Sequence, residues 1–262
     1  MFLKASVITA SVGSLLPEIS KATAIDENKA NTKEFYELKV YSLKNGDQQK
    51  LVEDFYEKAA IAALNKAGST VVGVFRELKP EGQSKIYVLI TYKTLEDFLK
   101  INETLWKDPE FTIAGAPYLN ATAANPAFER IESSLLQSFS HMPKLISPQK
   151  KSRIFELRRY ESPTELAGKK KIEMFNEAGE IDIFKRDGLT PVFFGETIIG
   201  ALRPNLTYMI TFDDMAAHDK NWKTFGNDPE WKKISSIPEY ADARIISRIT
   251  STFLIPTAFS QI

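Results

Sequence analysis

Cysteine is missing from all 262 residues. Its absence excludes disulfides, thiolate nucleophiles, iron–sulfur clusters and cysteine-ligated zinc. An excess of charge of one sign is missing too, because 34 Lys and Arg residues balance 34 Asp and Glu residues. A chain without net charge has no overall field to hold it on nucleic acid or on an acidic membrane. The sequence therefore predicts no nucleic-acid partner.

The N-terminal residues 1–24 contain no apolar stretch long enough to span a bilayer as a permanent helix. Residues 5–16 are mildly apolar, and Ala22-Thr23-Ala24 supplies the small-x-small pattern that signal peptidase needs. These features predict an export signal, with the mature protein in the periplasm or outside the cell and no stable membrane span. The alternative is a cytoplasmic protein whose first residues form a disordered tail.

The chain does contain a long internal repeat. Asp-Pro-Glu-Phe at residues 108–111 recurs as Asp-Pro-Glu-Trp at residues 228–231, an offset of 120 positions. Ile-Thr-Tyr at residues 90–92 recurs as Ile-Thr-Phe at residues 210–212 with the same offset. Solenoid units are only about 20–50 residues long, so a repeat of this length indicates a duplicated domain.

Each copy has the pattern strand, helix, strand, strand, helix, strand. Alternating apolar residues mark the strands, and apolar residues at helical spacing mark the helices. Gly68 fits the left-handed residue that ends a helix, and the closing strand of the second copy is expected at residues 244–254. The first copy occupies residues 33–140 and the second residues 152–256, with a proline-containing linker between them.

This order is that of a ferredoxin-like unit, so we predict an α+β fold of two tandem β-α-β-β-α-β units. Such a unit places both helices on one face of its sheet and leaves the other face bare. Two units side by side can bring their bare faces together and close a barrel. We therefore expect an intramolecular dimeric α/β barrel, either as a monomer with an internal pseudo-dimer or within a higher homo-oligomer.

Two short motifs carry a resemblance to a known family. Glu-Leu-Arg-Arg-Tyr at residues 156–160 opens the second copy, and Asp-Pro-Glu-Trp follows an apolar strand and helix. Both copies resemble the NIPSNAP domain family, a member of the dimeric α/β-barrel superfamily. The first copy departs from the family pattern, with Lys39 in place of arginine and Phe111 in place of tryptophan. The resemblance implies the fold and no accepted catalytic activity; relatives in the superfamily include monooxygenases, heme-processing enzymes and small-molecule binders.

The first strand of each copy carries an acid, a base and a phenol on one face, because alternate residues share a face. These residues are Glu37, Lys39 and Tyr41 in the first copy and Glu156, Arg158 and Tyr160 in the second. The opposite, apolar face is expected to meet the helices, which would direct the charged row into the barrel. Two interpretations stay open: an ion pair that fixes strand register, or a polar cavity in which Arg158 binds an anionic or carbonyl ligand.

The remaining polar and aromatic residues give weaker signals. His141 and His218 do not occupy equivalent positions, and no metal or nucleotide motif surrounds them, so we predict no metal and no cofactor. Lys169-Lys170-Lys171 is expected on a solvated helix face. The tryptophans are expected to anchor helix ends onto the sheet: Trp106, Trp222 and Trp231.

Three functions are compatible with these features. The first is a small-molecule-binding or otherwise non-catalytic module of unknown ligand. The second is a cofactor-independent oxygenase or isomerase that uses the acid, arginine and tyrosine set. The third is a protein-interaction scaffold that uses the helical exterior. Whether the protein is an enzyme stays open at this point.

Overall fold

The two repeats share one order of strands and helices in the computed structural model, which describes residues 32–262. The predicted export signal, residues 1–24, lies outside the described residues. The first repeat consists of β1 (Phe35–Ser42), α2 (Gly46–Phe55), the π-helical turn η1 (Tyr56–Ala60), α3 (Ile61–Ala67), β2 (Val72–Glu77), β3 (Lys85–Tyr92), α4 (Leu95–Leu105), α5 (Pro109–Ala114), α6 (Ala116–Leu119) and β4 (Arg130–Ser138).

The second repeat follows the same order. Its elements are β5 (Ile154–Glu161), α7 (Glu165–Asn176), α8 (Glu180–Arg186), β6 (Thr190–Ile199), β7 (Asn205–Phe212), α9 (Met215–Asn227), α10 (Pro229–Ser235), the 3-10 turn η2 (Pro238–Tyr240), α11 (Asp242–Ile245) and β8 (Arg248–Pro256). The expected strand at residues 244–254 is wrong at its start, because residues 242–245 form α11 and the strand begins at Arg248.

Local sequence explains where several helices begin and end. Thr94, Thr164 and Asp214 each accept a hydrogen bond from a backbone N–H in the first turn of α4, α7 and α9. Such caps satisfy N–H groups that have no partner within the helix. Gly68 ends α3 with a φ of 120°, and Gly179 separates α7 from α8 with a φ of 90°, a region that favours glycine.

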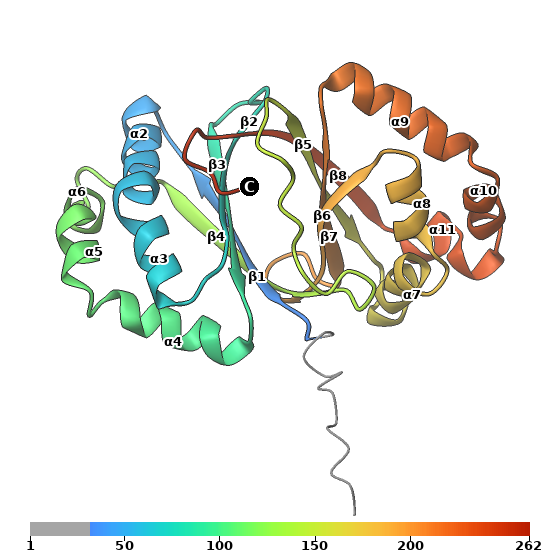
Figure 1. The fold of residues 1–262 in the computed structure, drawn as a ribbon, viewed down its shortest axis with the longest axis horizontal. Coiled ribbons are helices and arrows are strands. Elements are labelled where there is room, and N and C mark those ends of the chain that lie inside the picture. The colour runs from blue at the N-terminus through green and yellow to red at the C-terminus, as the bar shows by residue number, and fades with distance from the viewer. Residues whose placement is uncertain (1–31) are drawn as a thin grey trace, which may run out of the picture. The chain divides into compact units, whose positions relative to one another are not determined.

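The strands of both repeats close into one barrel in the order β1-β3-β2-β8-β5-β7-β6-β4. Each repeat contributes a four-stranded antiparallel sheet, and the sheets join where β2 pairs with β8 and β4 pairs with β6 (Figure 1). Closure leaves the two sheets without free outer strands. The predicted α+β fold of two tandem ferredoxin-like units in one barrel is confirmed.

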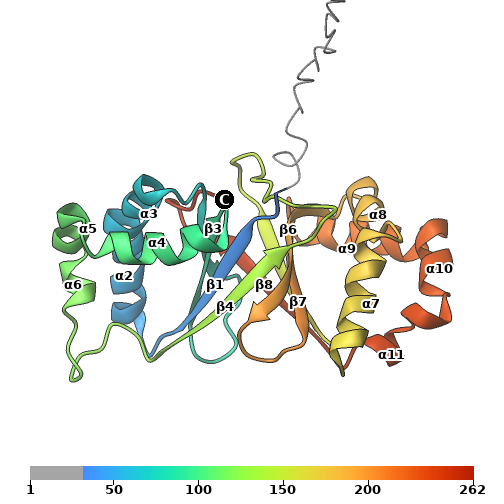
Figure 2. The ribbon, with the colours of Figure 1, turned by 90° about the horizontal axis from the view of Figure 1, so that it is seen from below.

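Helices cover the barrel on two opposite sides. Those of the first repeat, α2 to α6, lie on one side, and those of the second, α7 to α11, lie on the other (Figure 2). Apolar side chains fill the layer between each sheet and its helices. Among residues 32–262, no helix is both long and apolar enough to cross a membrane.

The inside of the barrel is lined by the apolar rows of the strands. Tyr36 of β1 meets Phe193 of β6 with ring centroids 5.2 Å apart, and Phe75 of β2 meets Phe155 of β5 at 5.1 Å. These pairs join the two repeats, and their members are fully buried. Near the end of β5 the inward row becomes polar, where Arg159 lies opposite Thr250 of β8.

The expected direction of the charged rows is therefore wrong. Glu37 and Glu156 lie on the outward face of their strands, beneath the helices, and the apolar rows point inward. The physical reason is that the partners of Glu156 lie on the helix side. The indole N–H of Trp222 on α9 reaches Glu156, whereas the rings inside the barrel carry no such donors toward it. A buried carboxylate goes where its hydrogen bonds are satisfied.

Segments between and after the strands complete both sheets. The C-terminal residues 257–262 run along β2, with the Thr257 N–H donating to the Val74 carbonyl at 2.9 Å. The linker takes the same place along β6, where the Ile146 N–H donates to the Val192 carbonyl at 2.9 Å. Each segment thus satisfies backbone groups that its neighbouring strand leaves unpaired.

Candidate functional site

The acid and the phenol predicted for the first repeat are buried and have hydrogen-bond partners within the protein. Glu37 is 6% exposed, and its two carboxylate oxygens accept from Ser133 Oγ at 2.7 Å and from the Tyr92 hydroxyl at 3.0 Å. Lys39 Nζ lies 3.4 Å from Glu37 Oε1. Tyr41 is buried, its hydroxyl lies 2.9 Å from that of Tyr56, and burial raises its pKa. Both carboxylate oxygens of Glu37 thus have partners within the protein, which favours the structural interpretation here.

The predicted acid of the second repeat has a richer environment. Glu156 is 1% exposed, and its Oε1 accepts from Arg158 Nη1 at 2.6 Å and from Ser251 Oγ at 2.7 Å. Its Oε2 accepts from the Trp222 indole at 2.9 Å and lies 3.4 Å from His218 Nε2. Four side chains from β5, β8 and α9 therefore converge on one carboxylate.

Arg158 links this carboxylate to a pair of phenols. Its Nη2 donates to the Tyr160 hydroxyl at 3.1 Å, and the Tyr160 hydroxyl lies 3.2 Å from that of Tyr208. The guanidinium carbon stacks 4.6 Å from the Trp222 ring, a cation–π contact. Burial opposes its charge, but Tyr208, Tyr160 and Glu156 raise the pKa of Arg158. Its Nε is buried without a partner.

The two repeats differ at the positions that cover the acid. Where the first repeat has Phe98 and Asn102, the second has His218 and Trp222. His218 Nδ1 lies 2.8 Å from Asp219 Oδ1, while its Nε2 faces Glu156. Both ring nitrogens therefore face carboxylate oxygens. The structure holds the charged set of the second repeat together in one hydrogen-bonded network, in which Arg158 Nε alone of the guanidinium nitrogens has no partner.

A second buried ion pair lies beside this network and was missed from the sequence. Lys171 was expected on a solvated helix face, but it is 2% exposed and its Nζ lies 2.9 Å from Glu180 Oε2. The Lys171 ammonium also lies 4.6 Å from the Phe175 ring and 5.6 Å from that of Trp231. Burial raises the pKa of Glu180, although Lys171 opposes that shift. The only sequence signal was the lysine's helical spacing from Phe175.

An opening in the barrel wall arises where the β2–β3 hairpin leaves β8. Strand β2 pairs with β8 only over Phe75–Glu77 and Leu254–Pro256. Pro80, which has no N–H, and Gly82, with a φ of 85°, turn the hairpin away. In the part of the chain that the structure describes, no strand pairs with residues 248–252 of β8 on this side.

This opening forms a cavity of about 480 Å³ at the polar end of the barrel. Its polar walls include Glu77, Tyr87, Thr250 and Ser251, and its apolar walls include Leu78, Met215 and Phe253. Small-molecule sites typically have volumes of about 300–1,000 Å³ with a few placed polar groups. None of the six residues singled out from the sequence lines it, but Ser251 connects its wall to Glu156 through the 2.7 Å hydrogen bond.

Two buried polar atoms of residues that line this cavity have no partner. These are Oε2 of Glu77 and Oγ1 of Thr250. The other carboxylate oxygen of Glu77 accepts from the Tyr87 hydroxyl at 3.1 Å. Burial and the neighbouring Glu77 raise the pKa of Tyr87, so its hydroxyl keeps the proton that it donates. A buried polar group without a hydrogen bond is costly, which marks this cavity as a place for a ligand or water.

The matching position in the second repeat is closed. Thr197 stands where the first repeat has Glu77, and its Oγ1 donates to Asn205 Oδ1 at 2.6 Å. The β6–β7 hairpin packs closely against β4. A Cβ added to Gly200 of this hairpin would lie only 2.5 Å from Ser134 Oγ. The fold therefore does not require the opening beside β8, which is a property of the first hairpin's sequence.

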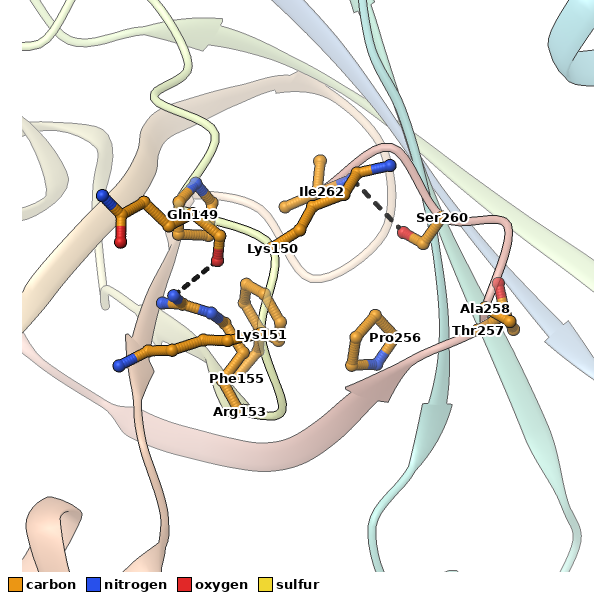
Figure 3. Close-up of a pocket in the computed structure, with 11 residues that line it drawn as sticks. Gln149, Lys150, Lys151, Arg153, Phe155, Pro256, Thr257, Ala258, Ser260 and Ile262 are labelled. Atoms are coloured by element: carbon orange, nitrogen blue, oxygen red, sulfur yellow. Dashed lines mark hydrogen bonds between the residues drawn. The ribbon is translucent and has the colours of Figure 1, made fainter.

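A smaller cavity of about 160 Å³ lies at the other end of the barrel (Figure 3). Phe155, Pro256 and Ile262 form part of its lining. Arg153 folds back to donate to the Gln149 carbonyl at 2.6 Å, as Figure 3 shows. Its volume is below the usual range for small-molecule sites, so the cavity beside β8 is the better candidate.

Comparison with known proteins supports the duplicated fold. The model of the NIPSNAP family matches residues 36–142 and again residues 155–261. The chain belongs to the NIPSNAP family. The predicted family and the tandem arrangement of its two NIPSNAP domains are thereby confirmed. No curated protein sequence gives a significant match.

Solved structures share the barrel at low sequence identity. A protein from Fusobacterium nucleatum subsp. nucleatum ATCC 25586, described as "Putative monooxygenase", has a TM-score of 0.57 and 10% identity, over 86% of this chain and 93% of its own. An anthrone oxidase-like protein has a TM-score of 0.53 and 12% identity, over 87% and 93%. A NIPSNAP family protein from Agrobacterium tumefaciens str. C58 is 21% identical over 42% of this chain and 98% of its own, with a TM-score of 0.37. For the first two proteins, the likeness at these identities shows the fold alone.

Proposed function

We propose that this NIPSNAP protein binds a small, neutral, hydroxylated molecule in the cavity beside β8. The observation that carries the proposal is the pair of buried, unpartnered atoms of two lining residues, Glu77 Oε2 and Thr250 Oγ1. A ligand hydroxyl can donate to the carboxylate oxygen and exchange a hydrogen bond with the threonine. Both buried groups would then be satisfied, which a closed protein interior normally requires.

The walls of the cavity indicate the kind of molecule that fits. The acids Glu77 and Glu81 are balanced by the bases Lys79 and Lys85, so the lining carries no net charge and favours a neutral ligand. Leu78, Met215 and Phe253 provide an apolar side for a ring or a short chain. Together these walls suit a molecule with an apolar body and at least one hydroxyl group.

The Glu156 network lies behind this site and is connected to its lining through Ser251. Glu156 already accepts from three donors, and both nitrogens of His218 face carboxylate oxygens. A group that must take a proton from a substrate needs a free acceptor within hydrogen-bond reach. The geometry therefore favours binding over the oxygenase alternative, and the names of the structural neighbours describe those proteins only. Export and the interaction scaffold stay predictions from the sequence.

Binding in the cavity is tested with the full chain. Native mass spectrometry of the purified protein reports any small molecule that it retains. Binding of 4-hydroxybenzyl alcohol, a defined probe, is then measured. We expect the probe to shift backbone amide NMR signals of residues 77–87 and 250–253. Glu77→Gln removes the anionic acceptor at nearly constant shape, and we expect it to weaken probe binding about tenfold, the usual effect of losing one hydrogen bond to a charged group.

The matched control changes the equivalent position of the second repeat. Thr197→Val removes the hydroxyl of a residue that does not line the cavity and should leave probe affinity unchanged. Toluene, which has the ring without hydroxyls, should bind more weakly than the probe. Signals that shift only around Glu156 and Trp222, or equal affinity in Glu77→Gln and wild type, would show that the cavity beside β8 is not the binding site.

A further inference from the structure

Helix α4 of the first repeat exposes a stripe of large apolar side chains. Leu95 is 44% exposed, Leu99 is 60% exposed and Trp106, the residue that caps the helix, is 66% exposed. Spacings of four and seven residues place them on one side of the helix. The expectation that Trp106 anchors the helix in the core is therefore wrong. Contiguous exposed apolar surface on a soluble protein typically marks an interaction site.

The fold does not require this stripe, because the second repeat builds the same helix without it. The equivalent positions on α9 are Met215, Asp219 and Gly226. Two of the three large apolar side chains are thus replaced by an acid and a glycine. In the second repeat the tryptophans lie elsewhere, and Trp222 and Trp231 pack against the core. The apolar stripe is a separate feature of the first repeat, defined here as Leu95, Leu99 and Trp106.

Charges along one flank of the stripe alternate in sign. In helix order they are Glu96, Lys100, Glu103 and Lys107, and all four are exposed. Glu96 and Lys100 pair within the helix at 2.5 Å. Read in the opposite direction, the series becomes base, acid, base, acid. An antiparallel copy of this flank would therefore place each charge opposite one of the other sign.

We propose that α4 packs antiparallel against α4 of a second copy of this chain, about a two-fold axis. With the axis between residues 101 and 102, Glu96 faces the partner's Lys107 and Lys100 faces the partner's Glu103. Trp106 then inserts between the partner's Leu95 and Leu99. Every contact occurs twice, as an isologous interface requires. A row of apolar side chains with a polar flank matches the usual anatomy of an interface.

A second copy fits this surface better than a membrane does. Helices that lie on membranes carry Lys and Arg in excess on their polar face. The flank of α4 has two acids and two bases, so it gains nothing from anionic lipid headgroups. A self-complementary row of charges, in contrast, specifies the orientation of a partner helix. Its electrostatic attraction is favourable for an antiparallel copy of the same helix.

The test is sedimentation velocity of the full chain over a range of concentrations. We expect the wild type to form a dimer whose dissociation constant rises about 30-fold or more in Leu99→Asp, the size expected when a central apolar contact is lost. This substitution installs the residue that the second repeat carries at the same position. Because Leu99 is exposed, the variant should fold, and circular dichroism checks that it does.

Charge reversal with rescue tests the orientation. Glu96→Lys alone places like charges together and should weaken the dimer about tenfold. Adding Lys107→Glu restores opposite charges and should return the affinity close to the wild-type value. Lys220→Glu, a reversal on α9 in the second repeat, is the control and should change nothing.

Three results would overturn the proposal. The first is a wild-type protein that stays monomeric at every concentration. The second is a dimer that Leu99→Asp leaves intact, which would place the interface elsewhere. The third is a monomer that sediments with phosphatidylcholine vesicles and loses this binding in Leu99→Asp, which would assign the stripe to lipid.

Discussion

Replacing Lys171 with methionine, while Glu180 stays in place, lowers the free energy of unfolding by about 3–5 kcal/mol at neutral pH. Both members of this pair are 2% exposed, and their charged atoms are 2.9 Å apart. Removing the ammonium leaves a buried carboxylate with no cation, and the protein must either pay its desolvation or keep it protonated. Urea unfolding of the full chain measures the effect.

The dependence on pH separates this cause from simple loss of packing. Burial raises the pKa of Glu180 above its value in the unfolded chain. A raised carboxyl pKa contributes stability that is complete below the unfolded value, about 4.3, and is lost as the pH rises through the folded value. In Lys171→Met the pKa of Glu180 rises further, so the stability of that variant should fall more steeply between pH 4 and 7 than that of the wild type.

A double variant is the matched control for the pair. Replacing Lys171 and Glu180 together with methionine removes both charges and keeps apolar volume among Phe175, Trp231 and Met174. Buried ion pairs replaced in this way are often neutral or gain stability. We expect the double variant to recover most of the loss and to show little change between pH 4 and 7. Equal destabilisation of the single and double variants would mean that the pair acts through its shape and not through its charges.

Phe155→Ala lowers the free energy of unfolding by about 3–5 kcal/mol, the usual cost of deleting a buried ring. Phe155 is fully buried inside the barrel, where it meets Phe75 of the other repeat. A double-mutant cycle with Phe75→Ala should give a coupling energy of about 0.5–1.5 kcal/mol between the repeats. Ile249→Ala on an exposed part of β8 is the control and should cost less than about 1 kcal/mol. Additive losses at Phe75 and Phe155 would contradict direct contact between the rings.

The strand and helix order could be predicted because it depends on local sequence. Alternation marked the strands, and Gly68 marked the left-handed end of a helix. The repeated Asp-Pro pairs marked the helices that begin at Pro109 and Pro229, where Asp108 and Asp228 cap the first turn. Duplication added the second essential constraint, because two bare sheet faces in one chain can cover each other.

The direction of the charged rows could not be predicted, for a physical reason. Alternation shows that Glu156 and Leu157 occupy opposite faces, but in a barrel covered by helices both faces are buried. Period-two patterning therefore does not say which row points inward. The answer depends on Trp222 and Ser251, which lie 66 and 95 positions away along the chain. The cavity beside β8 could not be predicted either. Pro80 predicts a turn, but the local sequence does not show that this turn leaves residues 248–252 of β8 without a pairing strand.

The most direct test of this account is a set of nuclear Overhauser contacts between side chains of the full protein. The account predicts cross-peaks from the Phe75 ring to the Phe155 ring, and from the methylene protons of Glu156 to the indole of Trp222. The first pair joins the two repeats inside the barrel, and the second places the acid beneath α9. Cross-peaks from the Glu156 methylenes to Phe75 and from the Phe155 ring to Trp222 would contradict the account. They would show that Glu156 points into the barrel and Phe155 points toward α9.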